Sequence, residues 1–185
     1  PKFYNYHNEI IEELVANGAK VDFYGEKPET ISYRFVSNYF KSIKSSFIDK
    51  YLNNILDNIK EQYDYFFFFW GEIITVDFLE KLKLLSPKAK FIMYQWDSIK
   101  FTPNYPKIIN FFDKVMTFDM KDSKELNIDY LALFYNNKYK NIYLNNTRCY
   151  DISFFGSYHS DRLEILKKLD LYCKEVGLKN YFHLY

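Results

Sequence analysis

The chain has 185 residues, which is enough for one well-buried domain and part of a second. Its 25 basic and 24 acidic residues are scattered and leave a net charge of +1, which argues against a nucleic-acid-binding protein. The two cysteines, Cys149 and Cys173, have no metal-ligand spacing, and neither a signal peptide nor an apolar run of membrane-spanning length is visible. We therefore expect a reducing, cytoplasmic setting.

Tyr and Phe number 19 each, which is high for a globular protein. The chain is also rich in Asn, Lys and Ile, as proteins encoded by AT-rich genomes are. Compositional bias is therefore the first explanation of the aromatic content, ahead of a surface that stacks bases or sugars.

The first predicted element is an amphipathic helix, which Asn5 or Asn8 would cap and Gly18 would end. Its apolar stripe consists of Tyr6, Ile10, Ile11, Leu14 and Val15. Residues 19–24 predict a strand. Because a helix followed this closely by a strand normally belongs to a βαβ unit, we expect a further strand to precede Pro1.

A long helix and an aromatic strand come next. Residues 36–59 predict one amphipathic helix, with Ser45 and Ser46 as a place where it could break. Residues 63–70 are almost continuously aromatic, and Gly71 stops the run. Such a run is typical of a strand that is buried on both faces of a parallel sheet.

Strands and helices then alternate as far as residue 135. The predicted helices are 76–85, 105–112 and 121–126, and the predicted strands are 90–96, 114–118 and 129–134. This alternation predicts an α/β fold, with residues 1–135 as a Rossmann-like, doubly wound parallel sheet that lacks its first strand. The polar residues 136–149 read as a linker.

Residues 150–185 predict the opening βαβ of a second Rossmann-like domain. Its parts are a strand at 152–155, a turn at Gly156 and Ser157, a helix that Ser160 caps and that runs to about Glu175, and a strand at 180–185. Because these residues are too few for a domain, we expect that the chain stops inside its second one, and that the aromatic-rich tail exposes apolar surface and drives association.

Ligands of open parallel sheets bind at the carboxyl ends of the strands. Asp97 and Asp119 end neighbouring predicted strands, where they could bind hydroxyl groups of a polar acceptor or act as a general base. The alternative is that each caps the turn or helix that follows it. Glu72 is a similar but weaker candidate.

His7 lies in the presumed first βα loop, where a general base or an oxyanion donor would be useful, although a surface or capping histidine is the alternative. Trp70 and Trp96 follow predicted strands and could stack on a sugar ring, although Trp70 could instead belong to the core. The acceptor-binding candidates are Tyr6, Trp70, Gly71, Trp96 and Ser98.

The turn before the last predicted helix is a candidate anion site. Gly156 and Ser157 lead into a helix N-terminus, which presents free backbone N–H groups, and His159 lies beside them. Arg162 falls in the first turn of that helix, where a cation is unfavourable unless an anion is near. A diphosphate would explain the cation at this position, and a salt bridge to Asp161 or to the partner domain is the alternative.

Several segments together resemble bacterial glycosyltransferases of the spore-maturation (CgeB-like) and lipopolysaccharide- or capsule-biosynthesis type, which are similar to other GT-B enzymes. The segments are Tyr6-His7, the Asn-Gly-Ala-Lys-Val-Asp of residues 17–22, Trp70-Gly71, the Gln-Trp-Asp-Ser of 95–98, the Phe-Asp-Lys-Val-Met-Thr-Phe-Asp of 112–119, the Tyr-Leu-Ala-Leu-Phe-Tyr of 130–135, and the Tyr-Asp-Ile-Ser-Phe-Phe-Gly-Ser of 150–157 with Asp161-Arg162. GT-B enzymes have two Rossmann-like domains that face each other across a cleft.

The resemblance implies an inverting or retaining enzyme that transfers sugar from a nucleotide-sugar donor to a cell-surface glycan or lipid-linked acceptor. Residues 1–135 would form the acceptor-side domain, and residues 150–185 would open the nucleotide-sugar domain, with Gly156, Ser157 and Arg162 near the donor diphosphate. The nucleotide-sugar is a substrate, and neither cofactor nor metal is expected, because helix dipoles and basic side chains stabilise the leaving diphosphate. The expected location is the cytoplasm, with peripheral association at the inner face of the membrane left open. Without the first strand and most of the donor domain, these 185 residues alone are expected to be inactive.

Two other readings remain. A non-catalytic binding or regulatory module of the response-regulator or flavodoxin-like kind would form an acidic Mg²⁺ site or a flavin site from residues 1–135 alone. A sugar-modifying epimerase or dehydrogenase is disfavoured, because no dinucleotide fingerprint is visible in the sequence.

Overall fold

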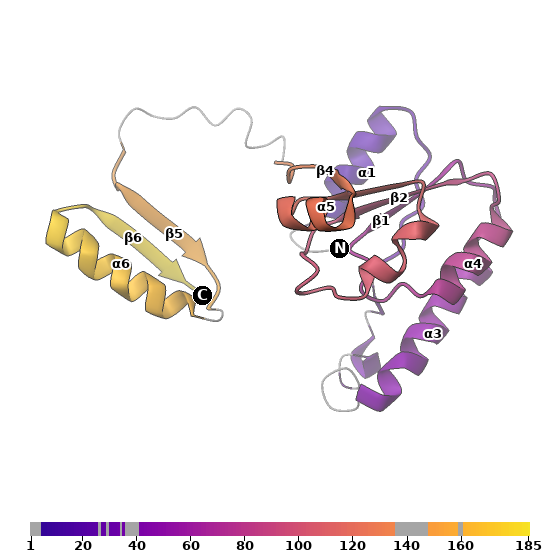
Figure 1. Cartoon of the computed structure of the whole chain (residues 1–185), viewed down its shortest axis with the longest axis horizontal. Helices are drawn as coiled ribbons and strands as arrows, with labels where there is room; N and C mark the ends of the chain where they lie inside the picture. Colours follow the sequence, from indigo (N-terminus) through magenta and orange to yellow (C-terminus); the bar gives the residue numbers. More distant parts are fainter. Residues whose placement is uncertain are drawn as a thin grey trace. The chain divides into compact units, whose positions relative to one another are not determined.

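The structure is a computed structural model that describes residues 5–25, 27, 28, 30–33, 35, 41–135, 148–158 and 161–185. It divides into two compact units, Pro1–Asn136 and Asn137–Tyr185, which we call the first and the second unit (Figure 1). Each unit is described by itself.

The first unit is built on a parallel sheet of four strands in the order β1-β2-β3-β4. The strands are β1 (Tyr65–Phe69), β2 (Lys90–Gln95), β3 (Lys114–Thr117) and β4 (Asp129–Tyr130). Phe67 pairs with Ile92, and Tyr94 pairs with Met116, in the parallel registers of β1 with β2 and of β2 with β3. The predicted α/β class with a parallel sheet is therefore confirmed, and the sheet is compatible with a Rossmann-like fold.

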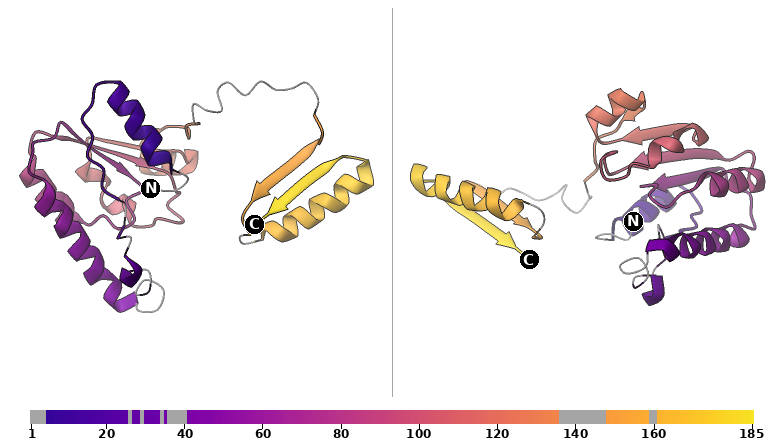
Figure 2. Two further views of the ribbon diagram at one scale, coloured as in Figure 1. Left: turned by 180° about the vertical axis from the view of Figure 1, so that it is seen from behind. Right: turned by 60° about the horizontal axis from the view of Figure 1, so that its bottom comes forward.

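Helices cover the two faces of this sheet unequally (Figures 1 and 2). The helices are α1 (Tyr6–Ala16), α3 (Lys41–Asn58), α4 (Val76–Leu85) and α5 (Met120–Leu126), with short 3₁₀ turns η2 (Tyr105–Lys107) and η3 (Ile109–Phe111). The core joins α3, α4 and η2 to one sheet face through Leu52, Ile55, Phe78, Leu79, Leu82, Phe91, Met93, Tyr105, Ile108 and Val115. Helix α1 lies on the other face, where the ring of Tyr6 contacts those of Trp96 and Phe134.

The predicted strand at residues 19–24 is wrong, because these residues belong to neither sheet. A strand exists only beside a backbone partner, and β1, the nearest edge of the sheet, pairs only with β2 among the described strands. Side chains hold the segment instead. Lys20 forms an ion pair with Glu61 at 2.7 Å, and Asp22 accepts a hydrogen bond from the Tyr63 hydroxyl at 2.6 Å.

The expectation that the aromatic strand is buried on both faces is also wrong. Phe66 and Phe68 pack against the core, whereas Tyr65 and Phe67 on the opposite face are 64% and 42% exposed. The reason is that, among the described residues, the core formed with α3 and α4 packs against the face that carries Phe66 and Phe68, and not against Tyr65 and Phe67. Strand β2 is buried on both faces, since Phe91 and Met93 on one face and Tyr94 on the other are all nearly inaccessible.

Other boundaries differ in detail. Helix α3 is continuous through Ser45 and Ser46, and the predicted residues 36–40 lie outside the described ones. The predicted helix 105–112 is two 3₁₀ turns, and the last predicted strand shortens to Asp129–Tyr130. Asn5 precedes α1, but its side-chain oxygen accepts from the Asn8 side chain and not from the backbone.

The second unit is a parallel pair of strands with one helix. Strands β5 (Ile152–Gly156) and β6 (Asn180–Leu184) flank α6 (Arg162–Val176) along the chain. The predicted strand–helix–strand order is thus confirmed. Gly177, at φ 75°, ends α6 in the left-handed conformation, and the Leu178 amide donates to the Cys173 carbonyl, as helix C-caps commonly do. Ser160, the predicted cap, lies outside the described residues.

We predict that Leu79→Ala lowers the unfolding free energy of the first unit by about 2–5 kcal/mol, because Leu79 is fully buried in the core. The matched control is Leu84→Ala on the same helix, where the side chain is 81% exposed, and we expect a change within about 0.5 kcal/mol. Urea unfolding measures both, and equal losses would contradict the described position of α4.

We also predict a pH-dependent effect of Asp113→Asn. Hydrogen bonding from the Phe91 amide, and then from the Lys90 ammonium group, lowers the pKa of Asp113. A lowered pKa stabilises the fold above the unfolded value of 3.8, and this stabilisation is lost as the pH falls through the folded value. The urea midpoint of the variant should therefore be lower than that of the wild type at pH 7, and the difference should shrink below about pH 4. Asp129→Asn, which removes only an exposed pair with Lys114, is the control.

Candidate functional site

The carboxyl ends of β1, β2 and β3 bring the acceptor-side candidates to one edge of the first sheet. Trp70 follows β1 directly and has a φ of 61°, in the left-handed region that a tryptophan adopts at a cost of about 1–3 kcal/mol. Gly71 is buried next to it, and a Cβ there would lie 2.8 Å from Cε of Met93. Close packing at Gly71 thus holds the backbone at the end of β1.

A buried polar network fixes the loop after β2. The Asp122 carboxylate is 2% exposed and accepts from the Ile99 amide at 2.6 Å and from the Tyr105 hydroxyl at 3.0 Å. Burial and then the hydrogen bond to this carboxylate raise the pKa of Tyr105, so that the phenol stays protonated and donates.

A second set of buried contacts supports the same loop. The Gln95 amide donates to the Thr102 hydroxyl, which donates to the Ser98 carbonyl at 3.2 Å. The Ser98 carbonyl also accepts from the Phe101 and Thr102 amides. The loop that carries Asp97 and Ser98 is therefore held from both ends.

The two aspartates predicted to act in catalysis have different surroundings. Asp119 is the N-cap of α5, where its carboxylate accepts from the Lys121 amide at 2.8 Å and from the Asp122 amide at 3.2 Å. Asp97 is half-buried, and among the described residues it has no hydrogen-bond or ion-pair partner. Glu72 lies 3.8 Å from the Lys44 ammonium group. Asp97 is thus the carboxylate of this edge that protein contacts leave available.

Aromatic rings from α1 and the sheet enclose Trp96. Its ring lies 4.7 Å from that of Phe69, 5.4 Å from Phe134 and 6.4 Å from Tyr6. Little of the indole is therefore open for stacking on a sugar, and its Nε1 is buried without a partner among the described residues.

His7 and Trp70 are also partly enclosed. The His7 ring stacks on Phe23 at 4.9 Å, and its Nδ1 is buried without a partner among the described residues. The Trp70 Nε1 is likewise buried and unpaired, while the Lys27 ammonium group lies 5.3 Å above the indole ring. Cation–π contact with Lys27 could not be anticipated, because the two residues are far apart in the sequence.

The predicted donor-phosphate residues belong to the second unit. The Arg162 guanidinium donates to the Ser157 carbonyl at 2.7 Å and lies over the Phe154 ring. A Cβ on Gly156 would lie 2.8 Å from that ring and 3.5 Å from Nη1 of Arg162. The structure thus brings Gly156, Ser157 and Arg162 together at the start of α6, and His159 lies outside the described residues.

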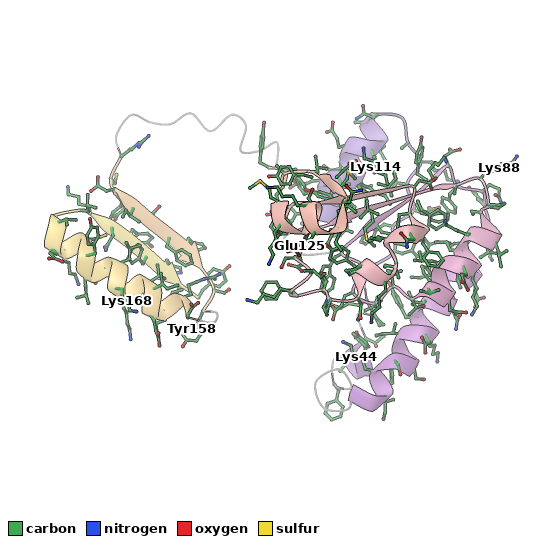
Figure 3. The ribbon with its side chains drawn as sticks, viewed as in Figure 1. Lys44, Lys88, Lys114, Glu125, Tyr158 and Lys168 are labelled. Atoms are coloured by element: carbon green, nitrogen blue, oxygen red, sulfur yellow. The ribbon has the colours of Figure 1, made fainter. Side chains whose placement is uncertain are left out.

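A hollow in the described part of the first unit lies elsewhere. It has a volume of about 630 Å³ and is lined by Gln62, Tyr63, Asp64, Tyr65, Pro87, Lys88 and Lys90, at the amino ends of β1 and β2. Figure 3 labels Lys88 at this end of the sheet. No predicted site residue lines it.

No group of three or more His, Cys, Asp or Glu side chains that could hold a metal ion occurs among the described residues. None of their helices is long and apolar enough to cross a membrane.

We predict that Tyr105→Phe lowers the unfolding free energy by about 1–3 kcal/mol, because it removes a donor from the buried Asp122 carboxylate. Hydrogen exchange at the Ile99 amide, which shares that carboxylate, should quicken as well. Tyr130→Phe, at a half-exposed position, is the control. An unchanged exchange rate at Ile99 would show that the network does not hold the loop.

No protein-family model, no curated protein and no solved structure matches this chain. A function must therefore be inferred from the residues of the two units and from their geometry.

Proposed function

We propose that this chain belongs to a glycosyltransferase that transfers sugar from a nucleotide-sugar donor to a cell-surface glycan or lipid-linked acceptor. The second unit would bind the diphosphate of the donor. The first unit would bind the acceptor at the carboxyl edge of its sheet. The reaction would occur in the cytoplasm, at the inner face of the membrane where the acceptor is linked to a lipid.

The observation that carries the proposal is the connection between β5 and α6. A parallel strand ends at Gly156, and a 15-residue helix begins at Arg162. The N-terminus of a helix attracts anions through its free amides and its dipole. Arg162 adds a positive charge at that terminus, where its interaction with the positive end of the helix dipole is unfavourable. The negative charge of a bound diphosphate would make the position of the guanidinium favourable.

On the acceptor side, we assign the general base to Asp97. Its carboxylate has no protein partner among the described residues, whereas that of Asp119 caps α5. A base at this position would remove the proton from an acceptor hydroxyl as the sugar is transferred. The Ser98 hydroxyl, on the same loop, would help to orient the acceptor.

No bound metal is required by this scheme. As the glycosidic bond of the donor breaks, negative charge develops on the leaving diphosphate. The amides at the start of α6 and the Arg162 guanidinium would stabilise that charge.

The regulatory-module reading finds less support at the same edge. It requires strand-end acids that are available to a cation. Asp119 and Asp122 instead accept hydrogen bonds from backbone amides and from Tyr105.

Titration of the isotopically labelled protein with UDP, GDP, CMP, dTDP and ADP tests the proposal. We expect one nucleotide to shift the amide resonances of Gly156, Ser157 and the first turn of α6 most strongly. Arg162→Gln should weaken that binding about tenfold, which corresponds to one lost charge-assisted contact.

Lys168→Gln is the matched control, because it removes one positive charge from an exposed position on the same helix (Figure 3). We expect it to leave the nucleotide affinity unchanged. The proposal fails if no nucleotide shifts these amides, or if both variants weaken binding equally.

A further inference from the structure

The hollow at the amino ends of β1 and β2 is not used by the proposed reaction. Its volume of about 630 Å³ lies within the range of small-molecule sites, which is about 300–1,000 Å³. Strand β2 has six residues, so at about 3.3 Å per residue the hollow lies roughly 20 Å from the carboxyl edge of the sheet. It is therefore separate from the proposed acceptor site.

Contacts inside the first unit fix the walls of the hollow. The Lys90 amide donates to the Asp64 carbonyl at 2.8 Å, and the Gln62 side-chain amide donates to the Leu85 carbonyl at 3.1 Å. These bonds join the chain before β1 to the chain before β2. All seven lining residues come from the middle of the continuously described range 41–135. The shape of the hollow is thus set by strand pairing and by the end of α4.

Some of the lining side chains are engaged by other parts of the protein. The Lys90 ammonium group lies 2.9 Å from the Asp113 carboxylate. The Tyr63 hydroxyl donates to the Asp22 carboxylate at 2.6 Å. These groups, like the amide nitrogen of Gln62, stabilise the walls and are poor candidates to bind a ligand.

Three other lining side chains are available. Tyr65 is 64% exposed, and Asp64 and Lys88 are exposed as well (Figure 3). Among the described residues, no hydrogen bond, ion pair or ring contact involves the side chain of any of the three. An aromatic ring, a carboxylate and an ammonium group therefore line one hollow without partners in the described part of the chain.

The charges of the lining favour an uncharged ligand. Asp113 neutralises Lys90, and the remaining charges of Asp64 and Lys88 balance each other. A nucleotide or another polyanion would be repelled by the carboxylate, and a cation would be repelled by the ammonium group. A ligand rich in hydroxyl groups suits both, because a hydroxyl donates to a carboxylate and accepts from an ammonium group.

The Tyr65 ring indicates which hydroxyl-rich ligand fits. The face of an aromatic ring carries partial negative charge, which attracts the C–H groups on the flat side of a sugar. Trp96 is enclosed by other rings, and the Lys27 ammonium group lies over the ring of Trp70. Tyr65 has no such neighbour among the described residues, and Pro87 adds apolar surface to the same hollow.

We propose that this hollow is a binding site for an uncharged oligosaccharide. One sugar ring stacks on Tyr65, while hydroxyl groups of the glycan donate to Asp64 and accept from Lys88. The site does not depend on the proposed transferase reaction. In a transferase it would hold a glycan acceptor far from its reacting end.

Titration of the isotopically labelled chain with cellopentaose, maltopentaose and mannopentaose tests the proposal. We expect one of them to shift the amide resonances of Asp64, Tyr65 and Lys88 most strongly. Tyr65→Thr should raise the dissociation constant at least about tenfold, because it removes the stacking surface. Threonine suits exposed strand positions, so the sheet itself should persist. Tyr65→Phe keeps the ring and should restore most of the affinity.

The matched control is Tyr130→Thr on β4. Tyr130 is 50% exposed and does not line the hollow, so the same ring is removed from a different strand of the same sheet. We expect this variant to bind the oligosaccharide like the wild type, and circular dichroism verifies that all variants are folded. Asp64→Ala and Lys88→Met should each weaken binding while leaving Tyr65 in place.

Three results would each overturn the proposal. They are the absence of shifts at these amides with every oligosaccharide, equal weakening by Tyr65→Thr and Tyr130→Thr, and binding of ADP in the hollow where no glycan binds. The transferase proposal is tested separately, by nucleotide shifts at the start of α6. Glycan binding in the hollow without nucleotide binding at α6 would therefore support this site and contradict the transferase.

Discussion

Parallel strands impose one requirement on this protein, which is that apolar surface on both faces of each sheet must be covered. Strand β2 meets this requirement on both faces. On one face, α3, α4 and η2 cover Phe91 and Met93. On the other face, the chain after β4 covers Tyr94, whose hydroxyl donates to the Leu131 and Ala132 carbonyls. Strand β1 and the β5–β6 pair meet it on one face only. The exposed side chains of Tyr65 and Phe67 on β1, and of Phe155 and Tyr181 on β5 and β6, lie on these open faces.

The same architecture places polar groups where chemistry can occur. Strands that run in one direction end at one edge, so the loops after β1, β2 and β3 lie side by side. At that edge, hydrogen bonds within the protein occupy two of the acids, and a third has no such partner among the described residues. Asp122 and Asp119 stabilise the loop and α5, and Asp97 stands on the loop that they hold. A rigid loop with one unpaired carboxylate is suited to bind a hydroxyl group, which is why the acceptor site is proposed there.

Sequence patterns predicted most of the helices and strands because their signals are local. The helical spacing of 76–85 and the aromatic run before Gly71 each depend on neighbouring residues only. The strand predicted at 19–24 failed because strand formation depends on a partner, which local pattern does not report. Tyr105 and Thr102 were not predicted as site residues for a related reason. Their roles come from contacts with Asp122 and Gln95, which the fold brings near, and no motif marks them.

By itself the sequence determined the α/β class, the order of the elements and the residues that follow each strand, because periodicity and turn residues act over a few positions. Only the tertiary structure decided which of these residues are available. It showed that Asp119 caps a helix, that Trp96 is enclosed by rings, and that Phe155 and Tyr181 face outward. The physical reason is that burial and hydrogen-bond pairing depend on what lies beside a residue in space, and in a parallel fold those neighbours come from distant parts of the chain.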